Sequence, residues 1–508
     1  MTTYKIGTRG SLLAVTQSTL VKNQLEALSG EKFELVLIKT QGDQITNKPL
    51  WQLEGKDFFT KELDEALLKG EVDLVIHSYK DLGSSRPEGI KLAAVTERKF
   101  AHDILLIPNE FTKKLKSWDG EFIVGTSSPR RIANIHFALK KYLPAKEDLE
   151  LRCETLRGNV NSRIKKLKDG QYHAITLALA GLERLAMTEK SAAELKDLFE
   201  GLNYFILPQS IFPSAASQGA LGIETLAYRT DGGKLEKIIS QLAHEKTIEE
   251  VVRERKAFKE YGGGCHLAVG IHVRKIGDNF LHVHHGEIDG NRIDKKWLEN
   301  QTLPKISGKK FIGLPSGTFP AVYDEYLEKV AEEKSLDFSN KHIFVTSRYC
   351  LPALKNSNLN SIKGLWAAGT KTAEKLAADG FWINGTSDSL GTEDLIIFKQ
   401  SKALQLLDPS IQNDWSVLSH ETATSELGAV TGCYQRKTKN ISSEYQDRLK
   451  EVEACYWTSF PEYQAFTEKF PFLKEVKHFC GLGKTWQEFN KAQVSVYPLA
   501  SIKDFYEL

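Results

Sequence analysis

Two stretches of this chain have the same order of features: an apolar, strand-like run, a short turn of small polar residues, and a helical pattern. Residues 7–11 (Gly-Thr-Arg-Gly-Ser) form the first turn, and residues 125–128 (Gly-Thr-Ser-Ser) form the second. Ser11 and Ser128 are suitable helix N-caps, and Pro129 occupies a first helical position, where proline is favoured. Strands that alternate with helices are typical of α/β layers. The repetition predicts two similar α/β domains that face a shared cleft.

A third unit begins near residue 224, after an apolar run at 174–180 that we expect to be a further strand. The segment Thr-Ile-Glu-Glu at 247–250 is a capping-box pattern, which predicts a helix with this threonine as its N-cap. Alternating residues at 269–273 and 280–284 predict two strands of a hairpin. This part should be a small α+β domain with one helix and an antiparallel sheet.

The C-terminal part of the chain contains a weak internal repeat beyond a polar stretch at 299–310. A Thr-Ser turn follows each of two apolar runs, at 343–345 and at 455–457. Segments that contain glycine and threonine come next, at 369–372 and at 483–485. A duplicated strand–turn–helix plan predicts two further α/β lobes.

At 508 residues the chain is too long for one hydrophobic core, and roughly three to five domains are expected. We predict that the first domain consists of two separate segments: the chain leaves it, forms the second domain and then returns. The predicted segments are, in order, 1–98 with 204–222, 99–203, 223–300, a linker at 301–310 and a two-lobed α/β region at 311–508.

The composition is that of an ordinary globular protein, with 41% hydrophobic and 26% charged residues. The net charge of +2 gives no general reason to expect nucleic acid or membrane partners, and no apolar run approaches the roughly 20 residues that span a bilayer. The six cysteines form no Cys-x-x-Cys pair, so neither a metal site nor a disulfide framework is expected. The N-terminus lacks a secretory signal pattern, which predicts a cytoplasmic protein.

Basic residues are concentrated at 125–170, where eleven lysines and arginines stand against five acidic residues. Arg130 and Arg131 fall in the first turn of a predicted helix, whose N-terminus already carries partial positive charge. An anion between them would relieve this repulsion, and the free N–H groups of the turn would contribute donors. The alternative is that both side chains simply point into solvent.

Arg157 and Arg163 flank a Gly-Asn turn, and Arg9 with Ser11 belongs to the corresponding turn of the first unit. Guanidinium groups bind carboxylates in a bidentate manner, so these residues predict a site for an anionic small molecule. Nucleic acid is a weaker alternative, because no stacking aromatic residues are interleaved with the basic ones.

Asp81 follows Lys80 just beyond a buried strand, at the sheet edge where cleft-facing groups of α/β proteins collect. A carboxylate in that position can transfer protons or stabilise a cationic intermediate. The alternative is a loop carboxylate that pairs with Lys80 or caps a turn.

Cys265 follows three glycines, and such a loop allows close approach of a ligand to the thiol. The thiol is therefore a candidate for covalent attachment. The alternative is a buried cysteine that acts as a small apolar residue, which is the reading we prefer for the five other cysteines.

Eight short motifs occur in order within residues 4–300: Gly-Thr-Arg-Gly-Ser at 7–11, Gln-Gly-Asp at 41–43, Lys56 to Glu62, His-Ser-Tyr-Lys-Asp at 77–81, Gly-Thr-Ser-Ser-Pro-Arg-Arg at 125–131, Leu-Arg-Gly-Asn-Val-Asn-Ser-Arg at 156–163, Ser-Gln-Gly-Ala at 217–220 and Gly-Gly-Gly-Cys at 262–265. Together they resemble the hydroxymethylbilane synthase (porphobilinogen deaminase) family. The resemblance implies two domains like type II periplasmic binding proteins and a third domain that carries the cysteine. It also implies a dipyrromethane cofactor joined to Cys265 by a thioether.

The same resemblance implies the reaction and the residues that carry it. Porphobilinogen loses ammonia to give an electrophilic azafulvene, and four such units are joined head to tail before hydrolysis releases hydroxymethylbilane. Asp81 is implied as the catalytic carboxylate. The implied ligands of acetate and propionate side chains are Arg9, Ser11, Lys80, Ser128, Arg130, Arg131, Arg157 and Arg163, and further candidates in the cleft are Gln17, Lys56, Phe59, Ser78 and Thr126.

Residues 310–508 more weakly resemble uroporphyrinogen-III synthase, through the two Thr-Ser turns and the glycine–threonine segments. That family closes hydroxymethylbilane into a ring with inversion of the last pyrrole. Ser459 and Thr485 are the candidate residues here. Two alternatives stay open: a deaminase with a degenerate C-terminal interaction domain, and a non-catalytic protein that binds small anions. In each case we expect a monomer.

Overall fold

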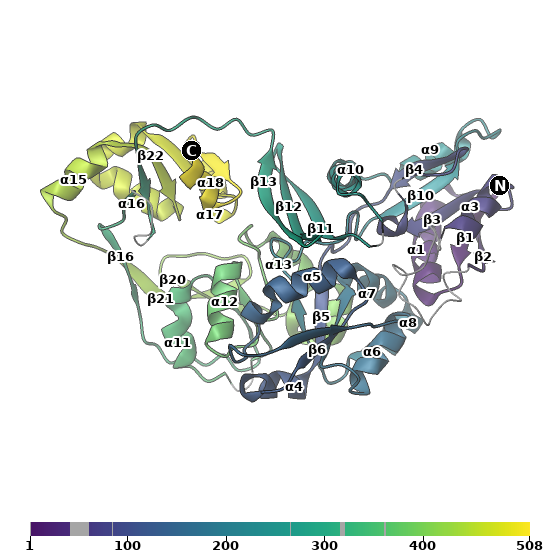
Figure 1. Ribbon diagram of the computed structural model, residues 1–508, viewed down its shortest axis with the longest axis horizontal. Helices are drawn as coiled ribbons and strands as arrows, with labels where there is room; N and C mark the ends of the chain where they lie inside the picture. The colour runs from purple at the N-terminus through teal and green to yellow at the C-terminus, as the bar shows by residue number, and fades with distance from the viewer. Residues whose placement is uncertain (1, 41–59, 84, 265, 315–320, 360–361) are drawn as a thin grey trace. The chain divides into compact units, whose positions relative to one another are not determined.

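The computed structural model describes residues 2–40, 60–83, 85–264, 266–314, 321–359 and 362–508 (Figure 1). Within these ranges no helix has the length and apolar character needed to cross a membrane. The chain folds into two compact units. The first unit contains Met1–Lys275, Val283–Lys295 and Gln400–Pro409, and the second contains Ile276–His282, Lys296–Lys399 and Ser410–Leu508.

The first sheet of the first unit has five strands in the order β2-β1-β3-β10-β4. Strand β1 is parallel to β2 and β3, whereas β10 is antiparallel to both β3 and β4. Figure 1 shows β10 beside strands that precede it by more than a hundred residues. The strands are β1 (Thr3–Arg9), β2 (Lys32–Ile38), β3 (Leu74–Ser78), β4 (Ile90–Val95) and β10 (Leu221–Leu226), and the helices around them are α1 (Leu12–Ser29), α3 (Lys61–Leu68) and α9 (Lys234–Ser240).

The second sheet repeats this order as β7-β6-β8-β5-β9, again with one strand, β5, antiparallel to its neighbours β8 and β9. The chain thus crosses between the sheets twice, which is the arrangement of type II periplasmic binding proteins. The prediction of two domains with this arrangement is confirmed. The strands are β5 (Asp103–Pro108), β6 (Phe122–Gly125), β7 (Leu151–Glu154), β8 (Ala174–Ala178) and β9 (Leu202–Ile206), and the helices are α4 (Asn109–Lys114), α5 (Pro129–Ala138), α6 (Val160–Lys168), α7 (Leu179–Ala186) and α8 (Glu189–Phe199).

Two boundaries differ from the sequence-based expectation. The strand expected at 174–180 ends at Ala178, and α7 begins at Leu179. The helix expected to be capped by Thr247 is α10 (Glu245–Glu260), whose N-cap is His244. The imidazole Nδ1 of His244 accepts a hydrogen bond from the backbone N–H of Thr247 at 3.3 Å, so a ring nitrogen takes the role that we assigned to a hydroxyl.

Helix α10 packs against a small sheet that follows it in the chain. Ala257 and Phe258 of the helix share an apolar cluster with Val269 and Ile271 of the sheet. The sheet has the strand order β11-β12-β13. The strands are β11 (Ala268–Ile276), β12 (Asn279–Ile288) and β13 (Asn291–Glu299).

The second unit contains two mainly parallel sheets, as the internal repeat predicted. A Thr-Ser turn follows β17 in one sheet and β22 in the other. The first sheet has the order β15-β14-β22-β23-β24, with β14 (Lys309–Ile312), β15 (Val322–Tyr323), β22 (Val452–Trp457), β23 (Lys477–Gly481) and β24 (Tyr497–Leu499). The second has the order β16-β21-β20-β17-β18-β19, with β16 (Leu327–Ala331), β17 (His342–Val345), β18 (Gly364–Ala367), β19 (Gly385–Thr386), β20 (Trp415–His420) and β21 (Gly428–Thr438).

The helices of this second unit follow the strands in the same way in both lobes. They are α11 (Leu351–Lys355), α12 (Thr370–Ala378), α13 (Glu393–Gln400), α15 (Ser443–Lys450), α16 (Phe460–Lys469), α17 (Lys484–Lys491) and α18 (Ile502–Glu507). Helix α14 (Lys402–Leu407) lies between α13 and α15 in the sequence but belongs to the first unit.

Candidate active site

The first unit contains a cavity of about 850 Å³ at the carboxyl ends of strands from both of its sheets. Its walls come from the turns after β1 and β3, from the start of α6 and from one side of α7. Among the described residues that line it, seven are basic and one, Asp81, is acidic. The basic residues are Arg9, Lys39, Lys80, Arg131, Arg157, Arg163 and Arg184.

Most of the predicted site residues in the described part of the chain line this cavity. They are Arg9, Ser11, Gln17, Ser78, Lys80, Asp81, Arg131, Arg157 and Arg163. Five other described candidates do not line it: Thr126, Ser128 and Arg130 of the first unit, and Ser459 and Thr485 of the second. Lys56, Phe59 and Cys265 lie outside the described residues.

Asp81 is the last residue of a short 3-10 turn, Tyr79–Asp81, which follows β3 directly. The backbone N–H of Tyr79 donates to the carbonyl oxygen of Ala220 at 3.0 Å, which ties the turn to the start of β10. Just before it, the hydroxyl of Ser78 donates to Gln17 Oε1 at 3.1 Å. The aromatic ring of Tyr79 is buried while Asp81 is exposed. The carboxylate therefore faces the cavity from a fixed backbone.

Lys80 lies next to this carboxylate in a more buried setting. Its ammonium donates to Gln218 Oε1 at 3.2 Å. Burial lowers the pKa of Lys80 to about 8, and the charge of Asp81 opposes that shift only in part. An anionic group entering the cavity would raise this pKa again, because it would favour the charged form.

Arg130 and Arg131 are both buried, and a buried carboxylate lies between their guanidinium groups. Arg130 Nη2 lies 2.8 Å from one oxygen of Asp103, and Arg131 Nη2 donates to the other at 2.7 Å. Burial alone would raise the pKa of Asp103, but the two positive charges and a hydrogen bond from Gln218 hold it well below its ordinary value. The anion expected at this helix N-terminus is therefore supplied, in part, by the protein itself. The alternative of two solvent-exposed arginines is wrong.

Ser128 and Thr126 act within the same turn. Ser128 is the N-cap of α5, and its hydroxyl accepts from the N–H of Arg131 at 3.5 Å. Thr126 Oγ1 accepts from the N–H of Ser128 at 3.3 Å. Both hydroxyls contact backbone groups of the turn that orients Arg131, and their direct contact with a ligand stays a prediction.

Arg157 and Arg163 lie on either side of a tight turn at Gly158. Gly158 has a φ of +114°, and an added Cβ would lie 2.2 Å from Ser162 Oγ, so only glycine fits there. Arg163 Nε donates to the carbonyl oxygen of Gly158 at 2.7 Å. Burial lowers the pKa of Arg163 to about 10, and the neighbouring Arg131 and Arg157 add to that shift. Among the described residues no acidic side chain forms an ion pair with Arg163, so its charge is available to a ligand.

Arg184, on α7, also lines the cavity and is not among the residues that the sequence predicted. Its Nη2 donates to the carbonyl oxygen of Gly219 at 2.7 Å. Burial lowers the pKa of Arg184 to about 10, and the charge of Asp81 opposes the shift. The available signal was the charged pair Glu183 and Arg184 inside an otherwise apolar run at 179–186. A cation in such a run needs a partner or a cavity.

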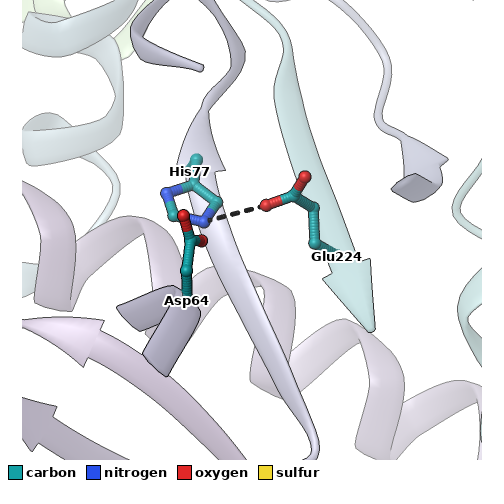
Figure 2. A group of neighbouring side chains, drawn as sticks. All are labelled: Asp64, His77 and Glu224. Atoms are coloured by element: carbon teal, nitrogen blue, oxygen red, sulfur yellow. Dashed lines mark ion pairs between the residues drawn. The ribbon is translucent and has the colours of Figure 1, made fainter. Parts of the chain in front are cut away.

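Asp64, His77 and Glu224 form a second buried cluster, with ligand-type atoms within 4.8 Å of one another (Figure 2). His77 Nε2 lies 3.4 Å from Glu224 Oε2. A positive charge is already present, because Arg86 donates to both oxygens of Glu224, at 2.7 and 2.8 Å, and to Asp64. These side chains form a buried ionic network that joins α3, β3 and β10. Strand β3 leads directly into the turn that carries Asp81.

Comparison with known proteins identifies the family. Residues 4–232 match the model of the family described as porphobilinogen deaminase, dipyromethane cofactor binding domain. A porphobilinogen deaminase from Synechococcus elongatus is 34% identical over 314 residues, which covers 61% of this chain and 89% of that protein. A porphobilinogen deaminase from Streptococcus sanguinis is 33% identical over 324 residues, which covers 62% of this chain and 99% of that protein.

A solved structure titled uroporphyrinogen-III synthetase from Helicobacter pylori 26695 covers 38% of this chain and 92% of its own. It is 18% identical and has a TM-score of 0.27. The family assignment therefore rests on the two curated relatives and the family model. The chain belongs to the porphobilinogen deaminase family, and it carries the dipyrromethane cofactor-binding domain of that family.

Proposed function

We propose that the first unit is a hydroxymethylbilane synthase, which joins four porphobilinogen molecules with loss of ammonia on a dipyrromethane held by Cys265. The observation that carries this proposal is a cavity whose described lining residues include seven basic ones around one carboxylate, Asp81. A chain of pyrroles with acetate and propionate groups needs such an excess of positive charge, because each ring adds two carboxylates. Arg163, which has no acidic partner among the described residues, fits such a group.

The residues of the cavity have separable tasks in this reaction. The dipyrromethane, when bound, supplies the free α-carbon to which the next pyrrole is joined. Asp81 accepts hydrogen bonds from pyrrole N–H groups and stabilises the positive charge that develops as ammonia leaves the substrate. Arg131, Arg157 and Arg163 bind carboxylates, which places the reacting carbons close together.

The test uses the full chain with porphobilinogen alone. Wild-type protein should consume porphobilinogen, and its intact mass should exceed the sequence mass by one dipyrromethane. Asp81→Asn should keep the added mass but lower turnover by about 10²–10⁴-fold, because it removes the charge that stabilises the cation. Near wild-type turnover in Asp81→Asn would reject the role of this carboxylate.

The matched test of attachment is Cys265→Ser, which should lack the added mass. A non-catalytic protein that binds small anions would show no added mass in any variant and would consume no porphobilinogen. Either observation alone, made on the wild-type chain, separates this alternative from the enzyme.

We further propose that the second unit is a uroporphyrinogen-III synthase, which would cyclise the product of the first. This proposal is supported by three polar groups that converge at the start of two neighbouring helices. Ser459 is the N-cap of α16, and its hydroxyl accepts from Arg436 Nη2 at 3.2 Å. Thr485, in the first turn of α17, donates to the carbonyl oxygen of Thr458 at 3.3 Å. Helix N-termini beside an arginine favour the binding of carboxylates.

A variant with an inactive first unit separates the two activities. Asp81→Asn in the full chain should still convert hydroxymethylbilane, supplied by an independent deaminase, into the III isomer of uroporphyrinogen. Spontaneous closure gives the I isomer, so production of the I isomer alone would identify a degenerate second unit. Arg436→Met should reduce the share of the III isomer, while Arg448→Met, at a half-buried position of α15 where the side chain pairs with Glu325, should leave it unchanged.

A further inference from the structure

One short segment of the C-terminal half of the chain is built into the first unit. Gln400–Pro409 belongs to that unit, although the residues on both sides of it belong to the second. Its helix α14 packs against α7 and α8. Ser401, Ala403 and Leu404 are fully buried there, with no exposed surface. This burial is that of an integral element of the first unit.

The contact is made by a buried carboxylate on α7. Glu183 Oε2 accepts from the hydroxyl of Ser401 at 2.6 Å and from the N–H of Ala403 at 3.0 Å, and its Oε1 accepts from the N–H of Lys402 at 3.1 Å. Ser401 Oγ also accepts from the N–H of Leu404 at 3.3 Å, as the N-cap of α14. Only 7% of Glu183 is exposed. The segment that covers Glu183 thus also supplies its hydrogen-bond donors, which a buried carboxylate requires because burial without partners is strongly unfavourable.

The cavity lies on another side of the same helix. All residues of α7 are buried, and Ala180, Gly181, Arg184 and Leu185 line the cavity. Arg184 follows Glu183 directly in the chain. A shift of α7 would therefore move the guanidinium of Arg184 and its hydrogen bond to the carbonyl oxygen of Gly219.

We propose that Gln400–Pro409 is a docking element, in cis, that positions α7, so that the reaction of the first unit depends on a segment from the C-terminal half. Glu183 is then a positioning residue that acts through Arg184. The catalytic part of this inference rests on the deaminase function proposed above, whereas the docking part does not.

The test combines amide hydrogen exchange and steady-state kinetics on the full chain. The variants are Glu183→Gln, Ser401→Ala and their combination, with Lys402→Ala as the control, because the Lys402 side chain is exposed and only its backbone meets Glu183. Glu183→Gln should speed exchange in α14 about tenfold or more, since it replaces a charged acceptor of three hydrogen bonds. If Glu183→Gln folds poorly, Ser401→Ala tests the same contact with a milder change. Exchange in α14 should be only slightly faster in the double variant than in the faster single variant, because both changes remove the same contact.

The kinetic arm decides whether the contact matters to the reaction. We expect KM for porphobilinogen to rise several-fold in Glu183→Gln and kcat to fall less, because Arg184 lies in the carboxylate-binding wall; Lys402→Ala should match the wild type in both. Unchanged exchange in α14 in every variant, or rapid exchange of α14 in the wild type, would overturn the docking. Faster exchange with wild-type KM and kcat would overturn the positioning role. A wild-type chain that consumes no porphobilinogen would instead reject the proposed function, while exchange would still decide the docking.

Discussion

The guanidinium of Arg255 lies over the ring of Tyr79, 4.6 Å from its centroid, and donates to the carbonyl oxygen of the same residue at 3.3 Å. It also donates to the carbonyl oxygens of Leu82 and Gly83, at 3.2 and 2.5 Å. One side chain of α10 thus holds the backbone on both sides of Asp81. The same helix ends at Glu260, and Tyr261 separates it from the three glycines that precede Cys265 in the sequence.

The first prediction concerns this contact. Arg255→Met should lower kcat about 10–100-fold, because two or three lost hydrogen bonds free the turn that presents Asp81. Arg255→Lys should recover only part of the lost kcat, since an ammonium keeps the charge but cannot reproduce the planar fork of donors. Lys256→Ala, an exposed neighbour on α10, is the control and should behave as the wild type. Steady-state rates with porphobilinogen measure the effect, and an unaltered kcat in Arg255→Met would contradict it.

The second prediction concerns the buried network around Arg86. Arg86→Met should destabilise the first unit by about 3–5 kcal/mol, because it leaves the carboxylates of Asp64 and Glu224 buried without their cation. Denaturant unfolding, followed by the transition of the first unit, gives the value. Adding Asp64→Asn should restore part of the stability, since one of the uncompensated charges is then removed. A loss of less than about 1 kcal/mol in the free energy of unfolding of Arg86→Met would contradict this prediction, because it would mean that water solvates the carboxylates of Asp64 and Glu224.

The third prediction concerns the low pKa of Lys80. In cofactor-free Cys265→Ser protein, Lys80 should be protonated below pH 8 and largely neutral above it, because its pKa is about 8. A bound carboxylate raises that pKa, so binding should take up a proton only above about pH 8, and the affinity should fall as the pH rises through that value. The measurement is calorimetry with a non-reacting pyrrole dicarboxylate, in two buffers of different ionisation enthalpy.

Lys80→Gln should abolish this proton uptake. Lys39→Gln, at an exposed position of the same cavity, is the matched control and should retain it. Equal uptake in wild type and Lys80→Gln would assign the proton to another group.

The fourth prediction concerns Glu462 in the second unit. Burial raises the pKa of Glu462 to about 7, although Thr458 donates to its Oε2 from both the backbone N–H and the hydroxyl. The folded state therefore holds a proton that the unfolded chain releases above its ordinary pKa of 4.5. Stability from this group is fully present below about pH 4.5 and is lost as the pH rises through 7, by up to about 1.4 kcal/mol per pH unit within the window.

Glu462→Gln imitates the protonated acid and should remove this pH dependence. Thermal unfolding of the second unit between pH 4.5 and 8 gives the comparison. Glu468→Gln, on the exposed side of the same helix, should keep the wild-type profile. Parallel profiles for wild type and Glu462→Gln would refute the raised pKa.

The sequence predicted most of the architecture because strands and helices carry their own periodicity. The duplicated turns at 7–11 and 125–128 do begin α1 and α5, after the first strands of two sheets with the same strand order. The prediction failed at 179–180, where α7 is buried on all sides and its first turn, Leu-Ala-Gly-Leu, has no polar residue to set it apart from a strand. Helix α14, which covers part of that helix, lies more than two hundred residues away in the chain.

The sequence also identified the charges of the candidate site, and nine predicted residues line one cavity. It did not separate Arg130, which pairs with Asp103 away from the lining, from Arg131, which pairs with the same carboxylate and still reaches the cavity. It did not select Arg184 at all. Neighbouring arginines on a helix have the same local pattern, and only the packing of the sheet around them determines which one, besides pairing with Asp103, also lines the cavity.

The sequence by itself determined the α/β class, the positions of the turns and the surplus of basic groups, since these follow from local periodicity, capping and charge. The tertiary structure decided which cations face the cavity, which are neutralised, and that a segment near residue 400 completes the first unit. These outcomes depend on contacts between residues far apart in the chain, whose burial and electrostatic energies exist only once the sheets and helices have packed.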